Sequence, residues 1–474
     1  MNKLKKKNSE NILYNIFKFS INTWFSFLIN FFAIMVTTRL FSPSELGKLN
    51  MFILISSVLL LFVPLGTDSS YLRLYFEPPN SRSAKYLMID GLRISSYVVL
   101  LLSGICFIFK DKIINFIVNN CEYDILVLLF IYLISSVVLR FLNLTYRLEN
   151  NAKLYNLQAI LITFTSKGLY SLLGLIYPNH RIAIWTISIF TLTLAIIFVS
   201  IQKLDFKNYK IDIRSDYKLL KFGFFILPAM LLVWVDSSIS RMIIREYMDF
   251  NFIGVYSAGV QFAALVTMIS SGFSCFWAPF VYSNYDKEEE KIKNMLKYVT
   301  LIAILFFCSI FLFQDLIFLL IGDKYKSLKH FFIFLFVTPI CYFISDSAGI
   351  GINIAKKSYW VSFISLISVS FNILISLMTV KKTGLLGIAI ANAISGVVVL
   401  ILRTLIGNIY YKMNAAKKNV AIALIVIISI CFVDFFSEIF ILKYVLSMFI
   451  IISTFFFYKY EIGYLLRIIS KYKK

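Results

Sequence analysis

Three basic residues stand inside long apolar runs, where a charge is costly. Lys167 lies about 22 Å along the run 152–177 if that run is a helix rising about 1.5 Å per residue, and Arg140 and Arg403 lie nearer the ends of theirs. A charge at such depth in a bilayer costs about 2.5 to 3.5 kcal/mol unless it faces a polar cavity or a partner. These residues are the first candidates for contact with a polar ligand. The alternatives are a structural ion pair for Lys167 and snorkelling to lipid head groups for the two arginines.

Two carboxylates, Asp236 and Asp346, also lie inside apolar runs. A buried carboxylate can neutralise a nearby arginine, or it can bind H⁺ or Na⁺ reversibly, because burial favours its protonated form. Simple pairing with a basic neighbour is the more ordinary of these roles. The sequence therefore indicates charge balance or ion coupling as the functions of the two residues.

Three further arginines, Arg39, Arg241 and Arg245, stand at the outer ends of the runs 12–38 and 218–240. Arginines at such positions either close a gate by pairing with carboxylates or anchor the helix ends at the membrane interface. Carboxylates close enough in sequence to act as gate partners are Glu45, Glu246 and Asp249. Gating and anchoring both remain open for these three arginines.

Signatures of metal, redox and nucleotide chemistry are missing from the sequence. The six cysteines are scattered without a CxxC pair, which favours buried packing over disulfides or metal ligation. There is no DxD, HExxH or Walker pattern, and His180 and His330 fall in short loops, where solvated side chains are expected. We expect no catalytic step, no metal and no cofactor.

The whole composition is that of an integral membrane protein. Of 474 residues 59% are apolar and 15% charged, and the mean hydropathy is +0.82, far from the balance of a soluble domain. We predict an all-α protein of about 14 transmembrane helices, or 12, because charges crowd the second, third and thirteenth runs. The predicted runs are 12–38, 46–66, 90–109, 123–146, 152–177, 182–202, 218–240, 253–281, 295–320, 331–354, 359–380, 385–410, 420–440 and 443–463.

Loop charge predicts the orientation of these runs. About 28 Lys and Arg fall on the side that holds both termini and about 13 on the other, which favours cytoplasmic termini. The formal net charge of +22 is thus mostly loop charge, so nucleic acid is not an expected partner. The longest loops, 203–217 and 282–294, are too short for a folded domain, so the function must lie within the membrane.

Two segments recur along the chain. Arg39 to Gly47 is echoed by Arg245 to Gly254, and the stretch 147–153 by 351–357, at offsets of 207 and about 204 residues. Such a repeat predicts a six-helix lobe at 1–202, a cytoplasmic linker at 203–217, a second lobe at 218–412 and two extra helices with a basic tail at 413–474. Chance likeness between Ile-, Phe- and Lys-rich segments is the alternative.

At these positions the chain resembles the Wzx-type oligosaccharide flippases of the polysaccharide biosynthesis protein family, in the MATE-like (MOP) superfamily. The resemblance covers about residues 37 to 400, with Ser42 where the family commonly has Gly. The segments that carry it are TTRLFSPSELGKLN at 37–50, Asp236 to Arg241 with IGVYSAGVQFAALV, Trp277-Ala278-Pro279, IGDKYKS, GINIAKKS and TGLLGIAIANAISG at 383–396.

The resemblance implies a protein of the bacterial cytoplasmic membrane that flips an undecaprenyl-diphosphate-linked oligosaccharide for cell-surface polysaccharide biosynthesis, by alternating access. Lys167, Arg140 and Arg403 would then attract the diphosphate. The implied partners are this lipid-linked oligosaccharide, the bilayer, and a polysaccharide polymerase with other assembly proteins. One rival is a MATE-type cation or drug antiporter, which the basic residues disfavour. The other is a membrane polymerase or ligase, which should carry a longer outer loop.

Overall fold

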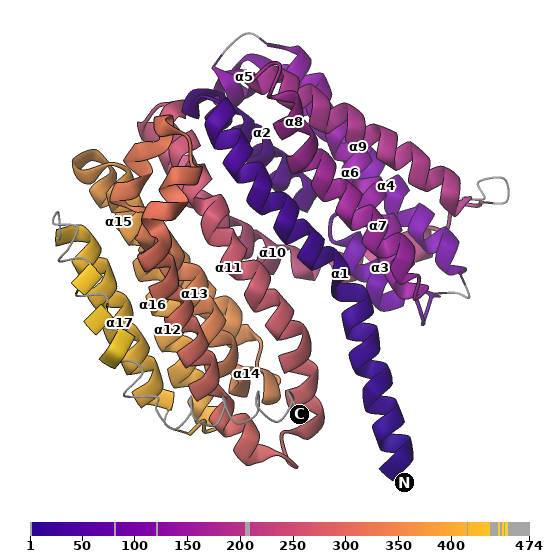
Figure 1. Cartoon of the computed structure of the whole chain (residues 1–474). Coiled ribbons are helices and arrows are strands. Elements are labelled where there is room, and N and C mark those ends of the chain that lie inside the picture. The colour runs from indigo at the N-terminus through magenta and orange to yellow at the C-terminus, as the bar shows by residue number, and fades with distance from the viewer. Residues whose placement is uncertain are drawn as a thin grey trace. The chain divides into compact units, whose positions relative to one another are not determined.

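The structure is a computed structural model. It describes the backbone of residues 2–79, 82–119, 122–203, 209–414, 416–436, 444–445, 448–449 and 451–453. Within these ranges it describes the side chains from residue 21 onward, except those of residues 275, 276, 278 and 279. Over these residues the chain is helical and contains no strand (Figure 1). Eleven of the described helices are long and apolar enough to cross a bilayer, or twelve if the bent pair of a 3₁₀ segment and α13 counts as one span. The protein is therefore an all-α integral membrane protein.

The chain divides into two compact units, 1–257 and 258–474. The elements of unit 1 are α1 (Asn2–Leu40), α2 (Pro43–Phe62), α3 (Thr67–Leu74), α4 (Ala84–Ile108), α5 (Lys110–Val118), α6 (Asp124–Leu148), α7 (Ala152–Thr163), the π-helix η2 (Phe164–Leu169), α8 (Tyr170–Leu173), α9 (His180–Gln202), α10 (Ile213–Tyr247) and the first turns of α11 (Phe250–Asn284). Packing thus groups α10 with the helices that precede it. The predicted lobe boundaries rest on the repeat and stay a prediction.

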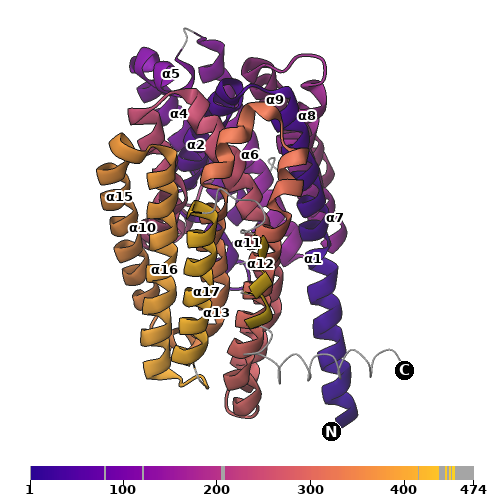
Figure 2. The same cartoon turned by 60° about the vertical axis from the view of Figure 1, so that its left-hand side comes forward.

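Unit 2 holds the remainder of α11 and the elements that follow it. These are α12 (Glu289–Leu320), the 3₁₀-helix η3 (Asp323–His330), α13 (Phe332–Ala348), α14 (Ile350–Ile354), α15 (Tyr359–Thr383), α16 (Leu385–Tyr410) and α17 (Ala416–Phe436). Helices α13 and α15 both pack against α16 (Figure 2). Close approach is possible because Gly396 and Gly407 of α16 face the backbones of Thr338 and Gly349.

The predicted runs fall on these helices, although the described residues contain 11 or 12 candidate spans and not the 14 predicted. The run 331–354 is divided into α13 and α14. The run 152–177 is not one α-helix but the succession α7, η2 and α8, and η3 meets α13 at an angle of 63°. The thirteenth run is α17, whereas most of the fourteenth, 443–463, lies outside the described residues. The described cysteines Cys106, Cys308, Cys341 and Cys431 are free thiols.

Aromatic side chains fill the core of unit 1 between α3, α4, α6 and α9. Tyr71, Phe141, Tyr146 and Phe198 are each at most 1% exposed. The Tyr71 hydroxyl lies 2.9 Å from the hydroxyl of Thr145, which satisfies its polar atom inside the core. This packing holds α6 and α9 side by side along their length (Figure 1).

The turn from α1 into α2 and the turn from α10 into α11 have the same hydrogen bonds at an offset of 207 residues. Phe41 N–H donates to the Thr37 carbonyl at 2.9 Å, and Met248 N–H to the Ile244 carbonyl at 2.8 Å. Leu46 N–H donates to Ser42 O at 3.0 Å, and Ile253 N–H to Asp249 O at 3.4 Å. Ser42 and Asp249, both good helix N-cap types, thus hold equivalent places. The repeat seen in the sequence is a repeated backbone turn.

The glycines of these two turns, Gly47 and Gly254, lie against each other's helix. A Cβ on Gly47 would stand 2.0 Å from the carbonyl oxygen of Phe250, and a Cβ on Gly254 would stand 1.8 Å from that of Pro43. Phe250 is the repeat equivalent of Pro43, so the contact is reciprocal, as around a local twofold axis. Only glycine permits this crossing of α2 and α11.

A second pair of turns repeats at an offset of 206 residues, close to the predicted value of about 204. Asn151 N–H donates to Tyr146 O at 2.8 Å and Lys357 N–H to Ile352 O at 3.0 Å. The residue before each, Asn150 and Lys356, has the left-handed backbone with φ of 57° and 55°. Both are helix-terminating turns of the Schellman type, placed after α6 and after α14.

Candidate functional site

Lys167 lies in the π-helical segment η2, which interrupts the run α7–α8. Hydroxyl groups compete with the helical ladder here, since Thr165 donates to Leu161 O at 2.6 Å and Ser171 donates to the Lys167 carbonyl. Gly168 lets the Phe164 ring pack against the backbone of this segment, since a Cβ at position 168 would stand 2.7 Å from that ring. Single π turns of this kind are common at functional sites, and this one carries Lys167, six residues before the end of α8.

Arg241 of α10 lies within electrostatic range of Lys167, so the two positive charges repel each other. The Arg241 Nη2 donates to the Ser237 carbonyl at 3.1 Å, while its buried Nε has no hydrogen-bond partner. Within the described part of the chain, neither Lys167 nor Arg241 forms an ion pair with a carboxylate. Two partly buried cations without an anion make this place, which we call the basic site, a candidate for binding an anionic group.

Arg140 and Arg403, by contrast, are neutralised by carboxylates. Arg140 Nη2 lies 2.5 Å from Oδ2 of the buried Asp68 in α3, and Arg403 Nη1 lies 3.1 Å from Oδ1 of Asp346. Ser274 also donates to Asp346, at 3.0 Å. Asp346 therefore has a basic partner, which is the more ordinary of the two roles expected for it. The partner of Arg140 comes from a distant short helix and was not predicted.

The outer arginines lie at helix ends. Arg39 is exposed in the last turn of α1, and Arg245 lies in the last turn of α10, where a positive charge complements the helix dipole. Arg245 also donates to the carbonyls of Phe116 and Asn115 at 2.9 and 2.8 Å and stacks 4.4 Å from the centre of the Phe250 ring. Asp236 lies partly buried on α10, the helix that carries Arg241.

Sequence reasoning was wrong about His180. Its side chain is not solvated but buried, at 4% exposure, and its Nδ1 lies 2.7 Å from Oε2 of Glu45 while its Nε2 lies 3.0 Å from Oε2 of Glu122. His330, in η3, is exposed as expected. A loop position signals solvent, and nothing in the local sequence indicates that two distant carboxylates enclose His180.

A second ionic network, also missed, joins the start of α4 to the start of α10. Asp90 is fully buried and accepts two hydrogen bonds from Arg82 at 2.9 and 2.7 Å, one from Tyr209 at 2.5 Å and one from Ser215 at 3.0 Å. Arg93 extends the network, since its Nη2 lies 2.5 Å from Asp216. The network fixes the end of the predicted linker, 209–217, to α4.

The electrostatics of this network favour its present charge state. Burial lowers the pKa of Arg82, but hydrogen bonding and charge attraction to Asp90 outweigh burial and leave that pKa above its ordinary value. Burial, helped by the hydrogen bond to Asp90, raises the pKa of Tyr209 to about 12. Both groups therefore stay protonated through the whole physiological range.

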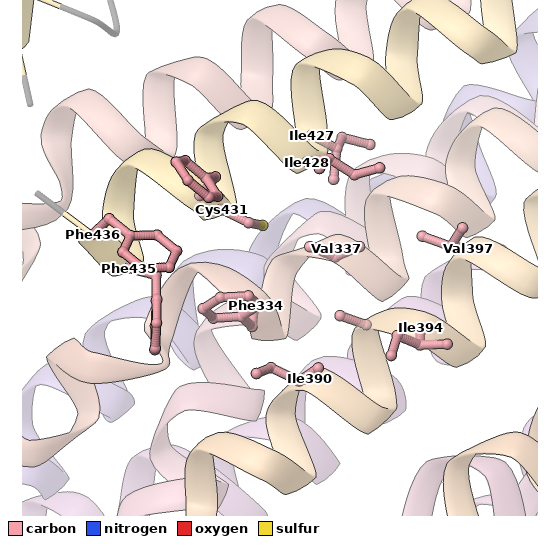
Figure 3. A pocket seen from close by; sticks show the side chains of 12 residues that line it. Phe334, Val337, Ile390, Ile394, Val397, Ile427, Ile428, Cys431, Phe435 and Phe436 are labelled. Carbon is pink, nitrogen blue, oxygen red and sulfur yellow. The ribbon is translucent and has the colours of Figure 1, made fainter. Parts of the chain in front are cut away.

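Unit 2 contains an apolar cavity of about 380 Å³ between α13, α16 and α17 (Figure 3). Its walls include Phe334 and Val337 of α13, Ile394 of α16, and Ile428 and Phe435 of α17. Walls of this kind suit hydrocarbon chains and offer no hydrogen bond to a charged head group. The cavity is thus not the place where an anion would be recognised.

Comparisons with known proteins support the fold. No protein family and no curated protein matches the chain. Among solved structures, the lipid II flippase MurJ in an inward closed conformation matches with a TM-score of 0.73 and 17% identity, over 94% of this chain and 99% of that one. A multidrug resistance MATE family transporter of the MOP superfamily, facing inward, matches with a TM-score of 0.55 and 16% identity, over 83% of this chain and 96% of that one. A mutant of the Vibrio cholerae MATE transporter VcmN matches with a TM-score of 0.54 and 13% identity, over 84% of this chain and 97% of that one. The chain therefore has the fold that these transporters share.

Proposed function

We propose that this protein is a flippase that moves an undecaprenyl-diphosphate-linked oligosaccharide across the bacterial cytoplasmic membrane for cell-surface polysaccharide biosynthesis. The observation that carries the proposal is the basic site, where Lys167 and Arg241 stand inside the spans without a carboxylate partner among the described residues. The fold shared with a lipid II flippase agrees with it. Both termini are then cytoplasmic, and no bond of the substrate is made or broken.

A lipid-linked diphosphate suits the basic site for a simple electrostatic reason. Two cations held apart from carboxylates in a medium of low dielectric repel each other and attract an anion strongly. A diphosphate offers several oxygens, so one group can accept from an ammonium and a guanidinium at once. The polyprenyl tail needs no polar site, because it can stay in lipid while the head group crosses.

The remaining basic and acidic candidates take secondary roles in this proposal. Arg140 and Arg403 reach the diphosphate only by exchanging Asp68 and Asp346 for it, which makes them transfer contacts along the path. Arg39 and Arg245 mark the outer gate, while Arg241, predicted from the sequence as a third gate residue, belongs to the basic site. Asp236 with Asp346 balances charge or couples transport to an ion. Alternating access, with one repeat moving against the other, carries the head group across. Product would pass to a polysaccharide polymerase and other assembly proteins.

A MATE-type cation or drug antiporter is the second candidate, because several solved structures with this fold are MATE transporters. A cationic substrate would be repelled by Lys167 and Arg241, and it would need a carboxylate that faces it. The prediction that separates the two is the sign of the ligand charge. An antiporter should bind a lipophilic cation, and its binding should strengthen when Lys167 becomes neutral.

Binding of farnesyl diphosphate by the purified protein tests the proposal. We expect Lys167→Ala with Arg241→Ala to weaken binding about 10-fold to 100-fold, since each change removes a charge-assisted contact. Lys167→Arg should keep most of the affinity, and Lys326→Ala, an exposed lysine that pairs with Asp323, should leave it unchanged. Neutral farnesol is the probe for the tail and should bind all variants alike. Equal affinity of the double variant and the wild type for the diphosphate would refute the basic site.

A further inference from the structure

His180 is the first residue of α9 and is enclosed by two other elements. Both its backbone N–H and its Nδ1 lie 2.7 Å from the same oxygen, Oε2 of Glu45, in the first turn of α2. Its Nε2 lies 3.0 Å from Oε2 of Glu122, which precedes α6. One buried imidazole thus joins the starts of three helices.

The other charged groups near His180 each have a partner other than the imidazole. On α2, Lys48 lies 3.8 Å from the second oxygen of Glu45. On α9, Arg181 donates to Asp124 of α6 at 2.9 Å, and Trp185 donates to the same carboxylate. In the segment before α6, Tyr123 donates to Asp111 of α5 at 2.7 Å. Glu45 and Glu122 are therefore the carboxylates that contact the imidazole.

A neutral imidazole does not satisfy this arrangement. It has one N–H donor and one bare lone pair, yet each ring nitrogen faces an oxygen of a carboxylate, which when ionised can only accept. One of the two contacts is then attractive and the other repulsive. With a proton on each nitrogen the ring donates to both carboxylates, and each hydrogen bond is charge-assisted.

The two nitrogens are not equivalent in their ability to release that proton. The bond of Nδ1 to Glu45 is supported by the backbone amide of His180, which donates to the same oxygen. Nε2 has Glu122 alone. Nε2 is thus the atom that gives up its proton, and the contact to Glu122 is the one that then opens.

We propose that Glu45, His180 and Glu122 form a proton-binding site, separate from the basic site, in which a proton on His180 Nε2 holds Glu122, and with it the segment before α6, against α2 and α9. Imidazole is a side chain that binds and releases a proton reversibly, so the ligand of this site is a proton. When the proton leaves, Glu122 faces a lone pair and its contact to His180 opens, while Asp124 of α6 stays bound to Arg181 and Trp185. The site needs no assumption about the transported molecule.

In the proposed topology the starts of α2, α6 and α9 lie on the outer face. The site then senses the acidity of the outer compartment, and the proton is a ligand for it rather than part of a chemical reaction. Loss of the Glu122 contact would loosen this end of unit 1 at high pH, and its formation would tighten the same end at low pH. This consequence rests on the proposed orientation, whereas the proton site itself does not.

Nitrogen NMR of the whole protein labelled with ¹⁵N-histidine tests the site. The chain has only two histidines, so His330→Gln leaves His180 as the single signal. We expect both ring nitrogens of His180 to be protonated at low pH and Nε2 to lose its proton as pH rises. Glu122→Gln should shift that loss to a pH about one unit or more lower, because the attracting charge is gone. A ring that stays in one neutral tautomer from pH 5 to 9, or a titration that Glu122→Gln does not move, would overturn the proposal.

Thermal unfolding of the same proteins gives a second readout. The proton stabilises the folded site, so the wild type should lose stability as pH rises from about 5.5 to 8.5, by about 3 °C more than His180→Gln does. Glu122→Gln should remove this extra pH dependence, since its amide can donate to a neutral Nε2. His330→Gln is the matched control and should behave as the wild type. An equal pH dependence in wild type and His180→Gln would contradict the site even if farnesyl diphosphate binds as proposed.

Discussion

Unit 1 has an ionic network at each of its two ends, and the two networks differ in chemistry. At one end His180 lies between Glu45 and Glu122, and at the other the Asp90 network joins Arg82, Arg93, Tyr209 and Ser215. Helix α10 spans the distance between them, because its end leads into the turn where Gly254 meets Pro43 of α2, whereas its start carries Ser215. Each network ties helix starts together in addition to the apolar core of the unit.

The difference lies in the donor. Guanidinium groups keep their protons at every physiological pH, whereas an imidazole gains and loses one. The Asp90 network is therefore a permanent clamp on α10, and the proposed His180 network is a clamp that closes when a proton binds and opens when the proton leaves.

The largest expected effect comes from breaking the permanent clamp. Asp90→Ala leaves Arg82 and Arg93 facing each other without their shared buried carboxylate, and we expect the free energy of unfolding to fall by about 3 to 5 kcal/mol. Chemical unfolding in detergent measures it. Glu77→Gln is the control, because the Arg73–Glu77 pair is exposed on both sides and should contribute nothing measurable. A small loss for Asp90→Ala would mean that the clamp does not hold α10.

A smaller effect is expected at the glycine crossing beside the His180 end. Gly254→Ala places a Cβ 1.8 Å from the Pro43 carbonyl oxygen, so α2 and α11 must separate there, at a cost of about 1 to 3 kcal/mol. Gly104→Ala in α4 is the control. Nothing lies within 4 Å of the added Cβ at Gly104, and alanine should stabilise that helix by about 0.5 to 1 kcal/mol. Unfolding midpoints that move in the same direction for both variants would contradict the crossing.

The smallest effect separates the two ends by pH. Because the folded pKa of Tyr209 is raised to about 12, above the value near 10 of an unfolded tyrosine, its contribution is complete below about pH 10 and is lost as pH rises toward 12. Tyr209→Phe removes the hydrogen bond to Asp90, so it should lower stability by a similar amount at every pH below about 10. It should also abolish the alkaline loss and leave the pH dependence between pH 5 and 9 as it is in the wild type. The comparison is made by melting wild type and variant side by side at pH 5, 8, 9 and 11. A pH dependence between pH 5 and 8 that differs between the two proteins would mean that the two ends are not chemically distinct.

Much of the fold could be predicted from the sequence, because lipid requires long apolar helices and these are visible as runs. Even the repeat was visible, since the Gly47 and Gly254 turns need the same residue types for the same backbone. The π-helical break at Lys167 could not be predicted, because it arises from several weak hydrogen bonds that side-chain hydroxyls donate to backbone carbonyls. The partners Asp68 for Arg140 and Glu45 for His180 lie 72 and 135 residues away and become neighbours only by folding. The sequence thus reveals single charges within apolar runs, but not the groups that pair with them.

The most direct test of the central claim uses a strain that lacks this protein and asks on which membrane face the lipid-linked repeat unit collects. A membrane-impermeant lectin or oxidant reports exposure at the outer face. The flippase account predicts that the repeat unit accumulates on the inner face, that the intact gene reverses this, and that Lys167→Ala with Arg241→Ala does not although the variant is present in the membrane. Accumulation on the outer face would contradict the account and move the function to polymerisation or ligation.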